Sequence, residues 1–263
     1  MDSIIADSFT ASGGPTYRKH FIPLESNPDV FNNLISLLGA SQSLVFEDVL
    51  SLDEPDLLPH PAVALILVFP TTSNYEARKV AEDAARGEYN SSEDHEDVLW
   101  FKQTINNACG LYGILHALAN GEARGVIETG SLLGHIFKSC SSLPLSERSL
   151  FLENSEELEK VYKEVAVQGS SEAPDNPEDE VDYHYVCFVK SHRSGRLYEL
   201  DGDRTGPIDR GQVLGPQDDV LAPGGLNVIR EYIEHERGNS NFGLMALVRR
   251  GGSNSVLQTE PLK

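Results

Sequence analysis

One cysteine of the chain lies where a helix is predicted to begin. Apolar residues recur with helical spacing from Cys109 to Asn120, so the thiol falls in the first helical turn. Unpaired backbone N–H groups and the positive end of the helix dipole favour a thiolate there, and a thiolate attacks carbonyl carbons. The amide of Gln103 and the backbone N–H of Cys109 would together bind the oxyanion that acyl transfer creates. The alternative is a small buried side chain without chemistry, the commoner state of a single cysteine.

A histidine and an aspartate lie on two strands that are predicted to form a hairpin. Residues 181–190 and 196–201 are rich in aromatic and β-branched side chains, and a short breaker stretch separates them. One antiparallel register sets His184 directly opposite Asp201, and the next register of the same parity keeps both side chains on one face. Either register supplies an imidazole base and a carboxylate that orients it. Taken separately, the two residues are an ordinary strand histidine and a turn aspartate.

The segments between these residues predict the helices and strands that hold them. A first helix runs from its cap at Asn27 to its stop at Gly39, and residues 62–69 are apolar on both faces, as in a central strand. Residues 75–86 predict an exposed helix that is rich in alanine and charge. Three further helices are predicted over residues 131–139, 146–153 and 155–165, and a last strand over residues 242–249. Helices that come first and strands that come later indicate an α+β fold with an antiparallel central sheet.

Composition divides the chain into one domain and two extensions. Residues 1–16 and 251–263 lack an apolar period, so we expect them to be disordered around a domain of residues 17–250. Within the domain, residues 168–180 combine prolines with acidic side chains and have no apolar period either. A connection of this length is either a plain disordered connector or a lid or binding loop. Composition alone leaves both explanations open.

The charge of the chain favours a basic partner. Its 21 Lys and Arg residues against 41 Asp and Glu residues give a formal net charge of -20, which disfavours nucleic acid and anionic membranes as partners. The alternative explanation is a solvated surface that only promotes solubility.

Cysteine content and the N-terminal segment indicate the compartment. Three cysteines without a Cys-x-x-Cys pair argue against a disulfide framework or a zinc knuckle and fit a reducing environment. The first residues carry no basic n-region, and the apolar run at 62–69 is too short to span a bilayer. We therefore expect a soluble intracellular protein in the cytoplasm, with the nucleus as a second location. No phosphate-loop or zinc-protease motif is found, so we expect no metal and no cofactor, and we expect a monomer.

Blocks of sequence around the candidate residues resemble one enzyme family in their order and spacing. The blocks are Gln103 with residues 107–110, residues 181–184, residues 197–202 and, closer to the N-terminus, residues 21–28 and 61–70. Together they resemble the ubiquitin carboxyl-terminal hydrolases, a papain-like family of thiol hydrolases, over about residues 17–250. The resemblance implies a single papain-like α+β domain, with helices flanking the antiparallel sheet and the chain threaded into a deep knot.

The resemblance also implies the reaction, which is hydrolysis of amide, ester or thioester bonds at the C-terminal glycine of ubiquitin. Cys109 would attack the glycine carbonyl, and His184 would first stabilise the thiolate and then protonate the leaving group. Asp201 would orient His184, while Gln103 would bind the oxyanion. The turn before Asp201 is about two residues longer than is common in the family, which makes Asp203 the alternative orienter.

Further residues are candidates for binding the substrate. In the family, acidic residues at the positions of Glu25 and Asp29 contact the basic tail of ubiquitin, although both also suit the start of the first helix. The long acidic loop corresponds to the family's active-site crossover, which favours small or flexible leaving groups, and it supplies Gln168 and Glu172 as candidates. Tyr183 either lines the slot for the glycines of the substrate or packs against its neighbours.

Two alternative functions stay open from the sequence. The first is a ubiquitin-binding or sequestering protein that keeps the fold and turns over little. The second is the same hydrolysis on a ubiquitin-like modifier, which the sequence does not distinguish from ubiquitin. Competent residues occupy all four chemical positions, so nothing missing from the sequence favours the binding protein.

Overall fold

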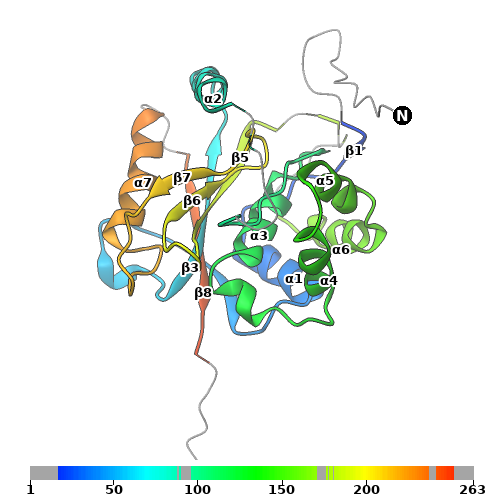
Figure 1. Cartoon of the computed structure of the whole chain (residues 1–263), viewed down its shortest axis with the longest axis horizontal. Coiled ribbons are helices and arrows are strands. Elements are labelled where there is room, and N and C mark those ends of the chain that lie inside the picture. The colour runs from blue at the N-terminus through cyan, green and yellow to red at the C-terminus, as the bar shows by residue number, and fades with distance from the viewer. Residues whose placement is uncertain are drawn as a thin grey trace, which may run out of the picture.

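A six-stranded antiparallel sheet runs through the centre of the molecule (Figure 1). The computed structural model describes residues 17–87, 89, 96–170, 176, 178–179, 181–236 and 241–251. The strands, in their order across the sheet, are β2 (Leu44–Asp48), β8 (Gly243–Arg249), β3 (Ala62–Pro70), β5 (Tyr183–Lys190), β6 (Leu197–Leu200) and β7 (Ile208–Gly211). Every neighbouring pair is antiparallel, which confirms the predicted sheet and the α+β class.

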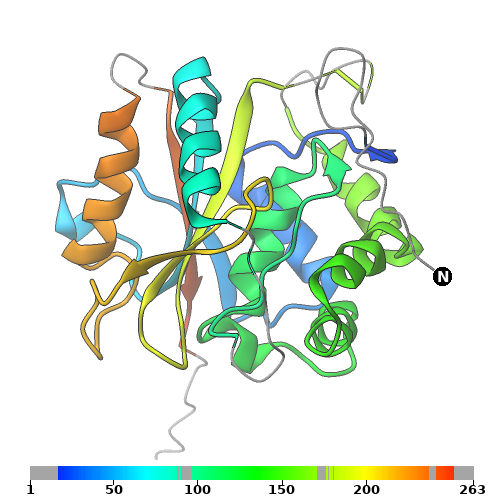
Figure 2. The same cartoon turned by 45° about the horizontal axis from the view of Figure 1, so that its top comes forward.

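Helices cover both faces of this sheet (Figures 1 and 2). They are α1 (Pro28–Leu38), α2 (Ser73–Arg86), α3 (Cys109–Ala119), α4 (Leu132–Cys140), α5 (Leu145–Glu153), α6 (Glu156–Ala166) and α7 (Pro223–His235), with short 3-10 helices η1 (Pro55–Leu57) and η2 (Ala123–Val126). Side chains of α1 and α3 to α6 share one apolar core, and α7 packs in a second core on the opposite face. Outside the main sheet, β1 (Lys19–His20) pairs in parallel with β4 (Ile105–Asn106).

The central strand β3 is buried on both faces. Leu65 and Leu67 lie in the core beneath α7, whereas Ile66 and Val68 lie in the core that contains α3. Successive side chains of a strand point to opposite faces, so an uninterrupted apolar run gives a strand with two apolar faces. The prediction of a central strand over residues 62–69 is therefore confirmed.

Helix α3 is enclosed along its whole length. All 11 of its residues are buried, and it packs against β5 and β3. A helix that is apolar all round belongs in a core, and this burial confirms the predicted central helix. Cys109 is its first residue, so the thiol lies at the end of a helix that is buried along its whole length.

The ends of α1 follow the predicted capping pattern. The Oδ1 atom of Asn27 accepts a hydrogen bond from the backbone N–H of Asp29 at 2.9 Å, and Gly39 ends the helix with φ of 88°. A Cβ atom on Gly39 would lie 2.4 Å from Cβ of Ser131, so this left-handed position requires glycine for both conformation and space. The first predicted helix is thus confirmed at both ends.

The order of elements is less simple than predicted. The sequence pattern does not predict β2, β7 or α7, and α7 lies between the hairpin and the last strand, so the expectation that helices precede strands is wrong. Helix α7 begins with Pro223 and two glycines, which are weak helix formers and hide the apolar stripe that reaches Tyr232.

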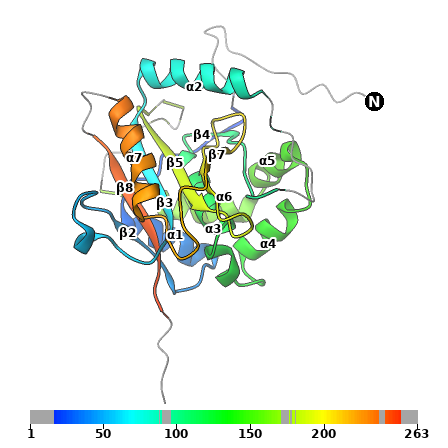
Figure 3. The same ribbon diagram turned by 60° about the vertical axis from the view of Figure 1, so that its left-hand side comes forward.

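Helix α2 is exposed over most of its residues, as its composition predicts, but it also has a buried face that the composition does not predict. Tyr75 is fully buried and Lys79 is 9% exposed, so one face of α2 packs against the molecule. The helix follows the end of β3 and lies beyond the end of the sheet at which β5 begins (Figure 3). This end of the sheet carries the candidate site.

Parts of the predicted domain plan are not tested by the structure. Residues 1–16, 252–263 and most of the centre of the 168–180 loop lie outside the described residues. The deep knot stays a prediction. Within the described part of the chain, no helix has the length and apolar character needed to cross a bilayer.

Candidate functional site

The hairpin brings the predicted histidine and aspartate together. Phe188 pairs with Glu199 in the β5–β6 ladder, and this register sets Asp201 on the same side of the hairpin as His184, offset along it. The Nε2 atom of His184 donates a hydrogen bond to Oδ1 of Asp201 at 2.7 Å, and both side chains are buried. Of the two registers that the sequence allows, the structure therefore has the offset one.

The cysteine at the start of α3 lies next to this pair. The thiol of Cys109 points at the carbonyl oxygen of Tyr183, with 4.0 Å between sulfur and oxygen, and Tyr183 directly precedes His184. Because Nε2 of His184 faces Asp201, the other ring nitrogen, Nδ1, is the one left for the thiol. The structure thus brings Cys109, His184 and Asp201 into one cluster from three distant segments.

The electrostatics of the cluster favour a charged imidazole. Burial lowers the pKa of His184, but the charge and hydrogen bond of Asp201, together with the neighbouring Cys109, raise it well above its ordinary value. Burial also raises the pKa of Asp201, and here the charge of His184 and its hydrogen bond more than offset that effect, so this pKa is lowered. An imidazolium beside a thiol favours the thiolate, which is the form that attacks.

The N-terminus of α3 lies at the thiol, because Cys109 is the first residue of this helix. Ala108 caps this helix without a side-chain hydrogen bond, and Asn107 turns the chain into the helix with φ of 57°. The first N–H groups of a helix have no partner within it, so an uncapped start leaves them available to an anion. An oxyanion formed at a carbon bonded to the sulfur of Cys109 would lie within hydrogen-bonding distance of these N–H groups.

Gln103 lies beside the loop that carries Asp201. Its backbone N–H donates to the carbonyl oxygen of Gly202 at 2.8 Å, and a Cβ atom on Gly202 would lie 2.9 Å from Cβ of Gln103. The side-chain Nε2 donates to the carbonyl oxygen of Ile105 at 3.1 Å, while Oε1 is buried and has no hydrogen-bond partner among the described residues. The structure therefore holds Gln103 near the cluster, but its described contacts do not include Cys109.

The carboxylate of Asp201 is held from several sides. Besides His184, Oδ1 accepts the backbone N–H of Asp203 at 2.8 Å, and Oδ2 accepts the hydroxyl of Tyr75 at 3.0 Å. The indole of Trp100 donates to the backbone carbonyl of Asp201 at 3.0 Å. The alternative orienter, Asp203, instead pairs through its side chain with a lysine of α2. The geometry thus assigns the contact with His184 to Asp201.

A cleft of about 730 Å³ opens beside the thiol. Its lining residues include Cys109, Glu25, Tyr183, Tyr185 and Phe242. Polar and apolar residues line it together, and they come from α3, β5 and the segment before α1, among others. A substrate that enters this cleft reaches the sulfur.

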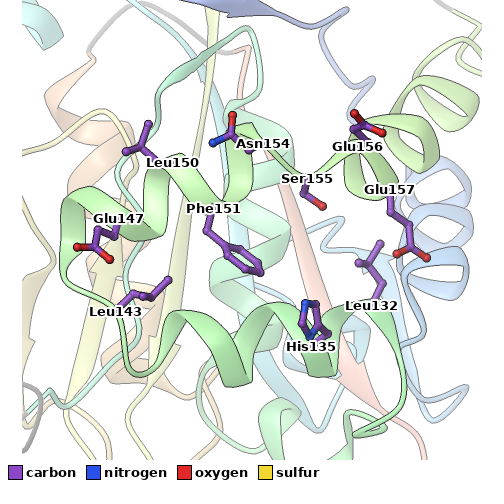
Figure 4. A pocket seen from close by; sticks show the side chains of 10 residues that line it. All are labelled: Leu132, His135, Leu143, Glu147, Leu150, Phe151, Asn154, Ser155, Glu156 and Glu157. Carbon is purple, nitrogen blue, oxygen red and sulfur yellow. The ribbon is translucent and has the colours of Figure 1, made fainter.

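A second cleft, of about 600 Å³, lies between α4, α5 and the start of α6 (Figure 4). There the rings of His135 and Phe151 are 5.8 Å apart, and Glu147, Glu156 and Glu157 line the edges. None of the clustered cysteine, histidine and aspartate residues contributes to it. The cleft beside the thiol is therefore the candidate active site.

The other cysteines differ from Cys109 in their surroundings. Burial raises the pKa of Cys140 to about 11 and also raises that of Cys187 well above its ordinary value. Both thiols therefore stay protonated and unreactive near neutral pH. Within the described ranges, no group of three or more His, Cys, Asp or Glu side chains is placed to hold a metal ion.

Comparison with known proteins identifies the family. A sequence profile of the ubiquitin carboxyl-terminal hydrolases, family 1, matches residues 21–234. The chain belongs to this family. Ubiquitin carboxyl-terminal hydrolase 3 of Arabidopsis thaliana is 34% identical over 236 residues, which cover 88% of this chain and 95% of that protein. Isozyme L1 of Homo sapiens is 33% identical over 230 residues, covering 86% of this chain and 97% of that protein.

Solved structures agree on the fold. The catalytic domain of Trichinella spiralis UCH37 bound to ubiquitin vinyl methyl ester superposes with a TM-score of 0.68 at 24% identity, covering 89% of this chain and 97% of that chain. The family resemblance read from the sequence blocks and the papain-like fold are thus confirmed. As a family member, the chain is a cysteine-type hydrolase.

The predicted substrate-binding residues of this ubiquitin carboxyl-terminal hydrolase fall into three groups. Glu25 and Tyr183 line the cleft. Asp29 and Gln168 are not among the described lining residues, and the amide of Gln168 is engaged with α1 and α6. Glu172 lies outside the described residues.

Some residues around the hydrolase site are not singled out by the sequence. Tyr75 and Trp100 hold Asp201, and Tyr185 donates to the carbonyl oxygen of Leu24 at 2.7 Å on the cleft wall. The available signal for Tyr75 is that it is the single aromatic residue of a helix otherwise rich in alanine and charge, because a large aromatic side chain is commonly buried.

Proposed function

We propose that this chain hydrolyses bonds at the C-terminal glycine of ubiquitin by thiol catalysis. The observation that carries the proposal is the buried pair of His184 and Asp201, 2.7 Å apart, placed beside Cys109 at an uncapped helix start. Base, orienter, nucleophile and anion donors are the complete set of parts for acyl transfer through a thioester. Family membership supports the substrate, because the matching relatives carry ubiquitin carboxyl-terminal hydrolase in their names.

The reaction proceeds in two acyl-transfer steps. The Cys109 thiolate attacks the glycine carbonyl, and the carbon–oxygen π electrons move to the oxygen of the tetrahedral intermediate. When this collapses, the bond to the leaving group breaks, and His184 donates its proton to the departing amine, alkoxide or thiolate. Water, deprotonated by the neutral His184, then attacks the thioester and releases the free carboxylate and the thiol of Cys109.

Backbone N–H groups at the start of α3 hold the oxyanion in this scheme, and Gln103 supplies a second donor once its amide turns from Ile105 toward the site. Each such donor contributes on the order of 3 kcal/mol to transition-state stabilisation. Asp201 keeps the imidazole aligned throughout and stabilises its protonated form.

The cleft suits a basic tail that ends in glycines. Glu25 and Tyr183 line it, and Glu25 and Asp29 at the start of α1 would attract the arginines of the ubiquitin tail. The formal net charge of -20 would steer the same tail toward the cleft. Glycines without Cβ atoms would pass beside Tyr183 to the sulfur, where larger residues are excluded. Gln168 and Glu172 stay candidates for contacts with the substrate from the connection that begins and ends near the lining residues Gly169 and Val181.

The connections of that loop support a preference for small or flexible leaving groups. At its first end Ser170 donates to Glu25 at 3.2 Å, and at its second end the backbone carbonyl of Asp179 accepts from Asn107 at 2.8 Å. The partners of these two bonds, Glu25 and Asn107, both line the cleft. A loop fixed in this way would restrict what passes over the thiol.

The test is turnover of a fluorogenic amide of the ubiquitin C-terminus by the wild type and by Cys109→Ala, with ubiquitin binding measured for both. We expect turnover by the wild type only and binding by both. Tight binding without wild-type turnover would instead identify a sequestering protein. Parallel amides of ubiquitin-like modifiers decide which modifier is preferred, and sedimentation and cell fractionation test the proposed monomer and cytoplasmic location.

A further inference from the structure

One face of α2 is attached to the loop that carries Asp201. At successive turns of this helix, Tyr75 donates to Asp201 and Lys79 pairs with Asp203. One turn further along, Asp83 accepts the backbone N–H of Thr205 at 3.2 Å. The spacing of four residues keeps these side chains on one face of α2. Successive turns of the helix therefore contact successive positions of the loop.

Tyr75 is the member of this row that reaches the catalytic cluster. Its hydroxyl lies 3.0 Å from Oδ2 of Asp201, the carboxylate oxygen that does not face the imidazole. The ring is fully buried and stacks edge-on against Phe69 with 4.8 Å between centroids, which leaves it little freedom to turn. The position of the hydroxyl is thus fixed by packing rather than by the bond itself.

The anchor of α2 adds a second support. Thr72 caps the helix by accepting the N–H of Tyr75 at 3.1 Å, and its hydroxyl donates to Glu236 at the end of α7 at 2.6 Å. The backbone N–H of Tyr75 is therefore connected to α7 through the side chain of Thr72. A carboxylate held through one oxygen alone can rotate about its Cβ–Cγ bond, whereas one held through both oxygens cannot.

We propose that Tyr75 is a positioning residue for this hydrolase, because its hydroxyl fixes the carboxylate of Asp201 and thereby the imidazole of His184. This inference rests on the proposed function, since it concerns how the same site is aligned. Tyr75 touches neither the substrate nor the thiol in this role. It acts through Asp201.

The hydroxyl stays a donor over the working range of pH. Burial and the charge of Asp201 raise the pKa of Tyr75 well above its ordinary value, so it does not ionise near neutrality. Charged and titratable groups act on Asp201 and Tyr75 from every surrounding element. They are His184 on β5, Glu199 on β6, Arg204 on the loop, Tyr232 on α7, His116 on α3, and Arg78 and Lys79 on α2. A donor to a carboxylate stabilises its charged form, so removal of the hydroxyl makes Asp201 easier to protonate.

The test compares Tyr75→Phe with Tyr198→Phe. Tyr198 donates to Asp97 at 2.9 Å from β6, so the control loses the same kind of phenol-to-carboxylate bond away from the cluster. For Tyr75→Phe we expect kcat to fall about three- to tenfold with KM for the ubiquitin amide unchanged, and the acidic limb of kcat/KM to move to higher pH by roughly half a unit. For Tyr198→Phe we expect none of these changes. Equal behaviour of the two variants would overturn the proposal.

Alkylation of Cys109 by iodoacetamide separates this proposal from the proposed function. It needs no ubiquitin, and the other two cysteines are buried with raised pKa values. We expect the pH midpoint of alkylation to move upward in Tyr75→Phe alone, because a less firmly held imidazolium stabilises the thiolate less. If wild-type turnover is absent but this midpoint moves, the proposed function fails and the positioning role stands.

A measurement on the wild type covers the case in which Tyr75→Phe does not fold. In protein labelled with 13C at the Cζ atoms of tyrosine, the Tyr75 signal should change when Cys109 is alkylated. Alkylation removes one of the groups that keep His184 charged, and His184 shares the carboxylate of Asp201 with Tyr75. The Tyr198 signal should not change. If the chemical shift of Tyr75 is the same before and after alkylation, the positioning role is overturned.

Discussion

Replacement of Asp201 by Asn tests the electrostatic basis of the site most directly. Two unit charges 2.7 Å apart attract by about 6 kcal/mol at an effective dielectric constant of about 20. Desolvation of two buried groups offsets several kcal/mol of that attraction. The net loss is then close to that of a hydrogen bond between charged groups, about 2–3 kcal/mol. This corresponds to a fall of about 30- to 150-fold in kcat/KM.

The sign of the pH effect follows from the same contacts. In Asp201→Asn, His184 loses the charge that raises its pKa, and burial then lowers that pKa. The imidazolium is therefore lost at lower pH, so the alkaline limb of the kcat/KM profile should move downward. The assay is turnover of the fluorogenic ubiquitin amide across pH, with urea unfolding to verify that the variant is folded.

Asp209→Asn is the matched control for this substitution. Asp209 is exposed on β7 and pairs with Arg196 at 2.7 Å, so the same chemical change removes an ion pair that solvent screens. We expect its kcat/KM to stay within about twofold of the wild type. If Asp201→Asn also retained at least half of wild-type activity with an unshifted alkaline limb, the role assigned to the buried pair would be wrong.

Three other substitutions test separate parts of the structure. Gln103→Ala should lower kcat about 100-fold in the same turnover assay with KM little changed, and an unaffected kcat would remove Gln103 from the oxyanion site. Gly202→Ala should lower the free energy of unfolding by about 1–3 kcal/mol in urea titrations, because its Cβ would lie 2.9 Å from Cβ of Gln103. Unchanged stability would mean that the loop moves to accept the added methyl group without cost, which would contradict the close packing of Gly202. Burial lowers the pKa of His116 to about 4, so wild-type stability should fall by about 3 kcal/mol as the pH drops from about 6.5 to 4. His116→Gln should flatten that dependence in urea titrations across this range, and an unchanged slope would contradict it.

Local sequence patterns predict the parts of the site that depend on spacing within one element. The start of α3 at Cys109 follows from apolar periodicity, and the alignment of His184 with Asp201 follows from strand alternation. Strand alternation leaves the choice between two registers open, because both place the side chains on one face. Only the pairing of Phe188 with Glu199 decides it.

Contacts between distant segments are beyond such patterns. Tyr75 and Asp201 are 126 positions apart in the sequence. Nothing in the composition of α2 indicates that its aromatic residue contacts the loop that follows β6. The meeting depends on where the sheet places the end of β3, which is a property of the whole fold. For the same reason the composition of α2 predicts its exposed residues but not the face that carries Tyr75 and Lys79.

The side-chain amide of Gln103 shows a different kind of gap. Its spacing before Cys109 predicts a donor at the site, and the backbone of Gln103 is indeed fixed against Gly202. The amide itself turns to Ile105, a choice among rotamers that spacing does not determine. Elements and registers are therefore better predicted than the last torsion angles of a polar side chain.

The complete burial of α3 has a consequence for how the enzyme loses activity. A helix enclosed on all sides opens only when the whole domain unfolds, so its amide protons should exchange with solvent last. The loop after β6, in contrast, is held by individual hydrogen bonds from α2 and from residues 100–103, and a partial opening there would displace Asp201 while Cys109 stays in place. Mild denaturant should therefore abolish turnover at a concentration at which the circular-dichroism signal of the helices is still unchanged. When the denaturant is diluted out, turnover should recover as fast as the loop closes, without refolding of the domain.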